Sequence, residues 1–405
     1  MQAKAIKDEH SLDARHLAET MPPAADSARI IPISTLLSQP TLIRQWTELA
    51  ERSSEPNPFT EKWYLEAASK ALAQDERVNI LVVFSKGELV GVIPMHVVHE
   101  YARLPLVHLQ NWLNHNAFLG TPLVAKGFER LFWRALFVEL DRQPTGSLFL
   151  HLAGMAVDGA VARALEAECK ATGRRFASFQ REKRAFLERG LSPEAYLETT
   201  LRGKKRKELR RQQNRLAELG QLEFQRMDGR AGLDSWIDEF LALERRGWKG
   251  SNGSALDCDD KTRSLFRGAL HGAANEGKLE LLALRLDGRA IAMLVNFLTP
   301  PGAFSFKTAF DEDYARFSPG VLLQIHNLAL LEREGIEWCD SCAAQDHPMI
   351  DSIWSGRRAI GRYSVAIGGP VRRAGFAILL AAEKAKGRLR QAISRKIIKD
   401  NEMSK

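Results

Sequence analysis

The chain has 405 residues, 45% of them hydrophobic, a length that exceeds one ordinary core and predicts about two domains. Its 58 basic and 50 acidic residues give a net charge of +8, which favours anionic partners such as phosphates, nucleic acids or lipid headgroups. The first twenty residues contain no uninterrupted apolar stretch of the kind typical of a signal peptide, and no run elsewhere approaches the roughly 20 apolar residues of a membrane span. The cysteines are too few for a secreted disulfide scaffold, so we expect a cytoplasmic protein.

The first part of the chain predicts a tail followed by one α/β unit. Residues 1–28 are polar and end in "MPPAADSA", which is typical of a disordered tail. "TLIRQWTELAERS" and "TEKWYLEAASKAL" have the apolar spacing of two helices. The segment 79–98, "NILVVFSKGELVGVIPMHVV", predicts a β-hairpin around a Lys-Gly-Glu turn, and a helix, "FERLFWRALFVELDR", and a strand, "SLFLHLA", follow.

The second part repeats this order of elements. Helices in "LDSWIDEFLALERRGW" and "DDKTRSLFRGALHGAANEG" precede a hairpin at 278–297, whose turn is Asp-Gly, and the helix "SPGVLLQIHNLALLEREG" leads to the strand "IEWCDSCA". We therefore predict a mixed α/β protein with two similar units, 29–188 and 189–369, each a mostly antiparallel sheet flanked by helices. A chance match between two hairpins is the alternative.

The segment 201–216, "LRGKKRKELRRQQNRL", places eight Lys or Arg side chains in sixteen positions. From Ser192 onward, leucines at helical spacing predict one helix that ends at a Gly220 C-cap. No aromatic residue is interleaved to stack on bases, and no helix-turn-helix, zinc-finger or RNA-recognition motif occurs, so we predict no sequence-specific DNA binding. A solvated helix face and a surface for an anionic ligand or tRNA both stay open.

The stretch "FKTAFDEDYARFSPGV" predicts a strand that ends near Lys307, an acidic loop, and a helix opened by Ser-Pro-Gly. Ser318 is expected to cap this helix. The free N–H groups of a helix N-terminus suit a phosphate, Arg316 would add positive charge, and Gly320 would let a ligand approach the backbone. A capped helix with nothing bound is the alternative.

These segments together resemble a known family. The glycine-turn hairpin, an aromatic-rich third strand, "FDEDYARFSPG", a helix and a strand ending in Asp resemble the BioF2-like acetyltransferase domain of the GNAT superfamily. "LRGKKRKELRRQQNRLAELG" and "LALERRGWKGSNGSAL" resemble it as well, so the resemblance covers about residues 190–368, while 30–186 is similar only as a degenerate copy. Doubled units of this kind are also similar to Fem-type aminoacyltransferases, which use aminoacyl-tRNA.

The resemblance implies acyl transfer from an acyl-CoA thioester to the amine of a small molecule, a sugar or an amino acid. It implies a coenzyme A site at Lys307, Arg316, Ser318, Gly320 and Val321. The sequence departs from the usual glycine pattern, because "RFSPGV" has its Gly one place late and has no second Gly. A tRNA-dependent aminoacyltransferase and a non-catalytic binding module with a decayed donor site therefore stay as alternatives.

Acyl transfer needs a base for the attacking ammonium and a donor for the developing oxyanion. "CDSCAAQDHPMIDSIW" supplies Asp340 at a strand end and His347 next to Asp346, and we predict that Asp340 and His347 are catalytic. The pKa of an ordinary His, about 6.5, suits a base at neutral pH. A surface position for His347 is the alternative. Cys339 and Cys342 have no partner motif that would complete a zinc site, so we expect structural thiols and no metal.

The glycine- and serine-rich loop in "ERRGWKGSNGSAL" is typical of loops that cover ligands. The predicted substrate-side residues are Glu244, Trp248, Lys249, Asp313, Tyr314 and Trp354. For Trp248, anchoring of the loop to the core is the alternative.

Residues 370–405 predict a basic amphipathic helix that either packs on the protein's own surface or rests on an anionic membrane. The second case would make the protein peripheral at the inner membrane face.

Overall fold

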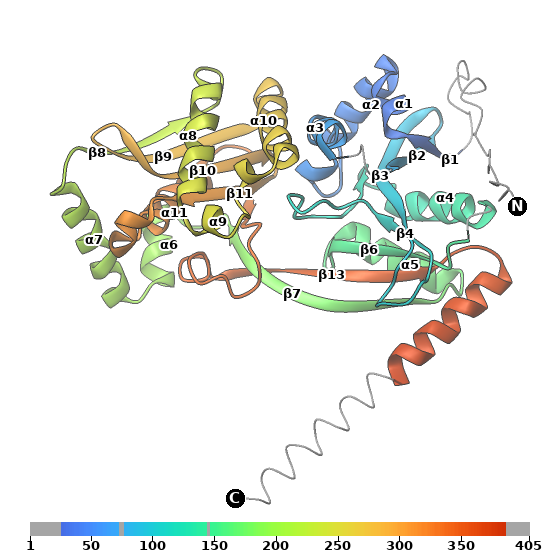
Figure 1. Cartoon of the computed structure of the whole chain (residues 1–405). Helices are drawn as coiled ribbons and strands as arrows, with labels where there is room; N and C mark the ends of the chain where they lie inside the picture. The colour runs from blue at the N-terminus through green and yellow to red at the C-terminus, as the bar shows by residue number, and fades with distance from the viewer. Residues whose placement is uncertain (1–25, 73–76, 144–145, 386–405) are drawn as a thin grey trace, which may run out of the picture.

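The computed structural model describes residues 26–72, 77–143 and 146–385 (Figure 1). The predicted tail therefore lies almost entirely outside the described residues, as do the last twenty residues of the predicted C-terminal helix. The first half contains β1 (Ser27–Pro32), α1 (Ile33–Leu37), α2 (Pro40–Glu51), η2 (Pro58–Thr60), α3 (Lys62–Leu72), β2 (Asn79–Ser85), β3 (Glu88–Val98), β4 (His108–Asn111), β5 (Leu123–Val124), α4 (Glu129–Arg142), β6 (Phe149–Ala156), α5 (Ala160–Ala171) and β7 (Phe176–Glu188).

After two additional helices, the second half repeats this order, but its helices after the hairpin are shorter and no helix lies between its last two strands in the described chain. It contains α6 (Pro193–Thr200), α7 (Gly203–Ala217), β8 (Leu222–Met227), α8 (Leu233–Arg246), α9 (Trp248–Ser251), η3 (Leu256–Cys258), α10 (Asp260–Asn275), β9 (Leu279–Leu286), β10 (Arg289–Thr299), β11 (Gly302–Phe310), η4 (Glu312–Phe317), α11 (Pro319–His326), η5 (Asn327–Glu332), β12 (Trp338–Asp340) and β13 (Gly356–Ala366). A last helix covers 370–385. No helix in the described ranges has the length and apolar character needed to cross a bilayer.

Both predicted hairpins are confirmed, and their turns have the same geometry. Lys86 and Gly87 join β2 to β3 with φ of 49° and 88°, and Asp287 and Gly288 join β9 to β10 with φ of 49° and 80°. Two successive positive φ angles are typical of the type I′ turn, which matches the twist of antiparallel strands and favours Gly at its second position. The mixed α/β fold with two similar units is therefore correct.

One continuous sheet runs through both halves, and each half gives its last strand to the other. The strand order is β1-β2-β3-β4-β6-β13-β7-β12-β11-β10-β9-β8, so the first-half strand β7 pairs with β12, and the second-half strand β13 pairs with β6. β7 and β13 pair with each other along the centre, at the lower side of Figure 1. Read inward from either edge, the sheet has the strands of one half in equivalent order, followed by the last strand of the other half. The limits 188 and 189 for the two units stay a prediction, and the sheet does not break there.

Helices and aromatic side chains also join the halves. In α10, a Cβ on Gly268 would lie 3.0 Å from the Cβ of Ala67, and a Cβ on Gly272 would lie 3.0 Å from that of Trp63, so α10 packs closely on α3. The ring of Phe59 lies 5.8 Å from that of Phe118 and 5.9 Å from that of Phe304, which joins one aromatic cluster across the junction.

The predicted single helix from Ser192 to Leu219 is wrong, because the structure has two helices. The first ends at Thr200, whose neighbour Leu201 is extended (φ −100°, ψ 131°) with its side chain buried, and the second begins at Gly203. The predicted C-cap is also wrong, since α7 ends at Ala217. Gly220 instead lies against Asp287, whose carboxylate accepts from the N–H of Gln221 at 2.8 Å.

Candidate functional site

Lys307 lies at the junction of the two halves, directly after a β-bulge in β11. Val295 of β10 pairs with Lys307, but the next residue of β10 pairs with Ser305, so Phe306 is the extra residue. The ammonium lies 5.0 Å from the ring centre of Phe118, a first-half residue, and 5.6 Å from that of Phe306. Bulges often redirect a side chain at a functional site, and this bulge places a lysine between aromatic rings. The strand was expected to end near Lys307, but it continues to Phe310.

The surroundings of Lys307 favour its neutral amine. Burial lowers the pKa of Lys307 to about 8, and the positive charge of Lys249 adds to this effect. Within the described residues its ammonium forms no ion pair and no hydrogen bond, so no carboxylate holds the proton. A partly buried amine that gives up its proton near neutral pH is suited to base catalysis. The sequence offered one signal for this role, a single Lys inside the aromatic run "FSFKTAF".

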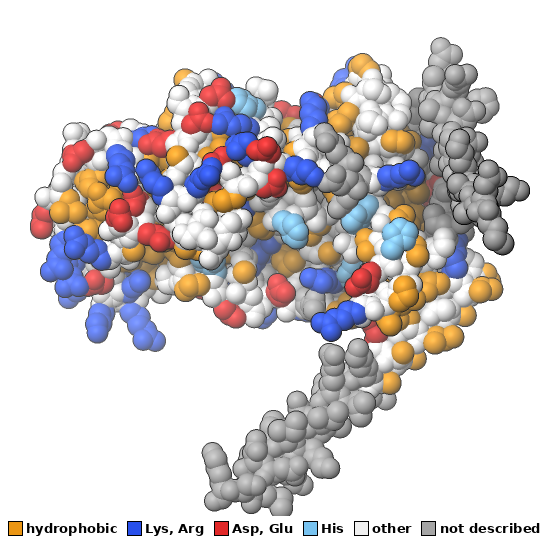
Figure 2. Space-filling model, in the orientation of Figure 1, with side chains coloured by type: hydrophobic (Ala, Val, Ile, Leu, Met, Phe, Trp, Pro, Cys, Tyr) orange, Lys and Arg blue, Asp and Glu red, His pale blue; other side chains and the backbone are white. Residues whose placement is uncertain are grey.

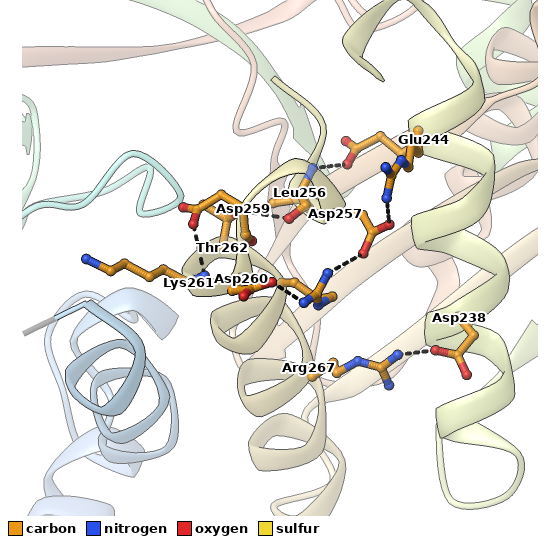
Figure 3. Close-up of polar contacts among 11 residues, drawn as sticks. Asp238, Glu244, Leu256, Asp257, Asp259, Asp260, Lys261, Thr262 and Arg267 are labelled. Carbon is orange, nitrogen blue, oxygen red and sulfur yellow. Dashed lines mark hydrogen bonds and ion pairs between the residues drawn. The ribbon is translucent and has the colours of Figure 1, made fainter. Parts of the chain in front are cut away.

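The buried Glu244 and the partly buried Lys249 form an ion pair close to Lys307. Glu244 is 4% exposed, and its carboxylate accepts from the Lys249 ammonium at 2.7 Å and from the N–H of Leu256 at 2.8 Å. Figure 3 shows Glu244 beside Leu256, with the cluster of Asp257, Asp259 and Asp260 at the start of α10. The hydrogen-bond partners of the Glu244 carboxylate thus come from the protein itself, and the ion pair with Lys249 holds the loop after α8 in place.

A second network ties the same loop to α10. Arg245 donates to Asp257 at 2.8 Å, Arg263 donates to the other oxygen of Asp257 at 3.1 Å, and the Thr262 hydroxyl donates to the carbonyl of Leu256 at 2.7 Å (Figure 3). Because both ends of the loop are anchored, Lys249 keeps a fixed position beside Lys307.

Trp248 lies on the surface. Its side chain is 55% exposed, so the alternative that it anchors the loop to the core is wrong. Its backbone N–H donates to Glu312 in η4 at 2.6 Å, which brings α9 next to the acidic loop. Asp313 is exposed there, and Tyr314 is partly buried against the apolar cluster under α11. An exposed indole beside these residues is available to a ligand.

Asp340 ends β12 as predicted, but its carboxylate is fully paired. It is buried, and it accepts from Arg184 of β7 at 2.7 Å, from Arg358 of β13 at 3.0 Å and from the N–H of Cys342 at 3.0 Å. Although burial disfavours the charge, Arg184 and then Arg358 lower the pKa of Asp340. A low pKa and three donors make a weak base, so the contacts favour a structural role. Its catalytic role stays a prediction.

His347 lies in the loop between β12 and β13 and is partly buried. Its Nδ1 atom is buried and has no hydrogen-bond partner in the described part of the chain. Neither Asp340 nor Asp346 bonds to its ring, and Asp346 accepts from Gln345 at 3.2 Å instead. The orienting carboxylate that we expected is therefore absent from the described contacts of His347, and its catalytic role also stays a prediction.

The predicted donor loop has the expected helix but not the expected cap. Ser318 occupies the N-cap position of α11 in a left-handed conformation, φ 52° and ψ 52°, and its side chain makes no capping hydrogen bond. Gly320 is buried, and a Cβ there would lie 2.9 Å from the sulfur of Met349 and 3.4 Å from Phe310. Its small size accommodates these protein atoms, and no open space for a ligand lies against its Cβ position. Val321 packs on the apolar clusters on both sides of α11.

Arg316 lines a cavity that was not predicted from the sequence. The cavity has a volume of about 350 Å³ and lies between α7 and η4, and its lining includes Arg211, Arg215, Arg316, Gln212 and Phe317. Glu208 and Glu218 also line it, and Glu208 pairs with Arg211 at 2.6 Å, so the arginines of the lining outnumber its glutamates by one. The guanidinium of Arg316 stacks on the Phe317 ring at 4.6 Å. Three arginines around one hollow suit an anion such as a phosphate. No sequence pattern predicts that α7 and η4 meet.

The remaining candidates lie in the core. Trp354 is fully buried in the apolar cluster between α6 and η5, so it has no exposed surface for a substrate. Cys339 and Cys342 are buried free thiols, and burial raises the pKa of both. Only Cys339 lies in β12, because the strand is shorter than we expected.

Comparison with known proteins gives one family and several similar structures. Residues 203–347 match the family model of the acetyltransferase (GNAT) domain, which confirms the resemblance in the second half. The fold is similar to the crystal structure of FemX, with a TM-score of 0.54 and 11% identity over 80% of this chain and 95% of that one. A conserved protein of unknown function from Bacteroides thetaiotaomicron VPI-5482 gives a TM-score of 0.51 and 14% identity over 80% and 96% of the two chains.

A third similar structure is the C-terminal domain (DUF2156) of a putative lysylphosphatidylglycerol synthetase from Agrobacterium fabrum. Its TM-score is 0.47, with 16% identity over 83% of this chain and 94% of that one. At such identities, the first two likenesses show the fold alone. No curated protein is significantly similar to the chain in sequence.

Proposed function

Residues 203–347 are a GNAT acetyltransferase domain in a fold that extends across the chain and is similar to that of FemX, and from this premise we propose an N-acyltransferase that uses acyl-CoA. The acceptor is an amine, bound at the junction of the two units. The observation that carries the proposal is Lys307, an unpaired lysine with a pKa of about 8 at that junction.

In this reaction Lys307 acts as the base. Its neutral amine takes a proton from the attacking ammonium, and the freed amine attacks the thioester carbonyl. As the tetrahedral intermediate collapses, the carbon–sulfur bond breaks, the new Lys307 ammonium gives its proton to the departing thiolate, and the second proton of the attacking nitrogen passes to solvent as the amide forms. The pKa of about 8 suits both steps, because it lies close to neutral pH. The partly buried His347, with its free Nδ1, is the second candidate for the base.

The arginine-lined cavity supports a phosphorylated donor. It begins at Arg316, inside the loop that the family resemblance assigns to coenzyme A, and Arg211 and Arg215 add positive charge from α7. Phosphate groups of the donor would bind there, which leaves the acyl end free to extend toward β11. Trp248 and Lys249 lie on the acceptor side, where the exposed indole can cover an apolar or sugar acceptor.

A second candidate is aminoacyl transfer from tRNA, and the surface around α7 favours it. Exposed basic side chains follow this helix, namely Lys204, Lys205, Lys207, Arg210, Arg211 and Arg215. Figure 2 shows a group of Lys and Arg side chains at the end of the molecule where Figure 1 labels α7. Such a surface can bind the phosphates along a nucleic-acid backbone as readily as it binds a small phosphate ligand. A non-catalytic binding module is the third candidate, and the lowered pKa of Lys307 counts against it.

The test is a transfer assay with nucleic-acid-free protein. Acetyl-CoA and a long-chain acyl-CoA are each offered with a set of amino acids and amino sugars, and thiol release is followed. In parallel, aminoacyl-tRNA is offered with the same acceptors. Thiol release that needs an amine and disappears in Lys307→Met supports the proposal. Transfer from aminoacyl-tRNA alone replaces it with the second candidate, and binding without transfer from either donor leaves the third.

A further inference from the structure

The last helix, 370–385, is attached to the first half by one face. Phe376 and Leu380 are buried against Phe149 and Ala366, with the rings of Phe149 and Phe376 5.3 Å apart. At the start of the helix, Arg372 donates to backbone carbonyls in the last turn of α4 and just after it, at distances of 3.0 to 3.4 Å. The predicted packing on the protein's own surface is therefore right for this inner face.

The opposite face of the same helix is apolar and uncovered. Val371 is 86% exposed and Ile378 is 72% exposed, which are the highest values among the exposed large hydrophobic side chains of the described residues. The alanines that share this face are also exposed, namely Ala374, Ala381, Ala382 and Ala385. Figure 2 shows hydrophobic side chains along the outward side of this helix. These positions recur every three or four residues, which makes one continuous stripe.

The sequence after the helix combines the same apolar spacing with positive charge. Residues 386–405 contain seven Lys or Arg and two Asp or Glu, and Leu389, Ile393 and Ile397 continue the spacing of the stripe. An apolar stripe flanked by basic residues is typical of segments that rest in the interface of an anionic bilayer, with apolar side chains at the acyl boundary and Lys or Arg at the headgroups.

The charge of the segment decides between two occupants. A second copy of the chain would bring an equal excess of positive charge to the same contact, and like charges repel across an interface. An anionic lipid surface supplies the opposite charge and an apolar layer together. An anionic lipid surface therefore complements both the apolar stripe and the positive charge.

We propose that the outer face of helix 370–385 is a docking surface for an anionic membrane. The helix lies along the membrane surface, and Val371 and Ile378 enter the acyl boundary. The GNAT domain would then work beside the bilayer, within reach of acceptors or donors that lipids carry. This inference is independent of the proposed reaction.

Vesicle binding by the full chain tests the proposal. We expect co-sedimentation with vesicles of phosphatidylcholine mixed with phosphatidylglycerol, little with phosphatidylcholine alone, and weaker binding as salt rises. Val371→Gln combined with Ile378→Gln should bind about tenfold more weakly or worse, because burial of each side chain is lost while the charge stays the same. Leu191→Gln is the control, since Leu191 is also exposed but lies in the second half.

A fluorescent label distinguishes lipid contact from self-association. In a Cys258→Ser background, a polarity-sensitive dye at Ile378→Cys should shift to shorter wavelength when anionic vesicles are added, and the same dye at Leu191→Cys should not shift. Equal vesicle binding by the Gln variant and wild type would overturn the proposal. So would a dye shift that follows protein concentration without lipid, because the stripe would then be a contact between copies.

Discussion

Arg184 of β7 donates to Asp340 of β12 at 2.7 Å, and both side chains are buried. The first residue belongs to the first half of the chain and the second to the second half, so this ion pair lies where the halves exchange strands. Arg358 of β13 binds the same carboxylate at 3.0 Å. One carboxylate therefore holds three central strands together.

Asp340→Asn should destabilise the protein by about 3–5 kcal/mol, because it leaves the buried Arg184 and the partly buried Arg358 without their counter-charge. Chemical denaturation measures this loss, with the exposed Glu337→Gln, three positions before Asp340, as the control. In the wild type, the lowered pKa of Asp340 means that its contribution is complete above about pH 4 and is lost as the pH falls toward the lowered value. Normal stability with lost turnover would instead return Asp340 to a catalytic role.

The pH profile of transfer should follow Lys307. If its neutral amine is the base, kcat/KM rises about tenfold per pH unit below pH 8 and levels off above it, since the pKa is about 8. Lys307→Arg keeps the positive charge but cannot lose a proton in this range, so it should lose about 100-fold or more, as Lys307→Met does. An arginine variant that keeps its activity would mean that charge, not proton transfer, is needed.

Donor binding should depend on the cavity between α7 and η4. Arg215→Ala and Arg316→Ala should each raise the donor Kd by about tenfold, as expected for loss of a charge-assisted hydrogen bond to phosphate. Arg210→Ala is the matched control, because Arg210 is exposed on the same helix but does not line the cavity. Calorimetric titration with acyl-CoA measures all three. Equal affinities would place the phosphates elsewhere.

Gly272→Val should loosen the packing of α10 on α3. Its Cβ would lie 3.0 Å from the Cβ of Trp63 and 3.2 Å from its carbonyl oxygen, and overpacking of this kind costs about 1–3 kcal/mol. Gly203→Val in α7 meets only the end of Arg206 at 4.0 Å, so it serves as the control. The two free energies of unfolding are compared by urea denaturation. Identical values would show that the helices separate to admit the side chain.

Thiol labelling should distinguish one cysteine from the other three. Cys258 is exposed, whereas Cys169, Cys339 and Cys342 are buried. Burial raises the pKa of Cys169 to about 12 and also raises those of the other two, so their reactive thiolates are scarce. A thiol reagent should therefore modify one site rapidly in the native protein, and Cys258→Ser should abolish that rapid phase. Fast modification of two or more sites would contradict the buried positions.

Local patterns in the sequence predicted the hairpins and the doubled unit, because turn chemistry and strand periodicity are read within twenty residues. Lys86–Gly87 and Asp287–Gly288 have the residues that their turns require. The break between α6 and α7 was missed, since the leucine spacing continues through it. The burial of Trp354 and the exposure of Trp248 depend on distant segments, and no local pattern contains that information.

The exchange of β7 and β13 was missed for the same reason. No strand was predicted at 176–188, and the partners of β7, the strands β12 and β13, come more than 100 residues later. The resemblance assigned Lys307 to the cofactor, and its lowered pKa depends on burial and on the nearby charge of Lys249, which only the assembled fold provides.

The position of β13 in the sheet also determines when the first half can complete its fold during synthesis. β6 and β7 leave the ribosome early, but the strand that lies between them ends at Ala366. The first unit therefore lacks this strand until translation has passed Ala366. A ribosome that stops between the units releases a product with two unpaired strand edges, which is the kind of species that chaperones bind.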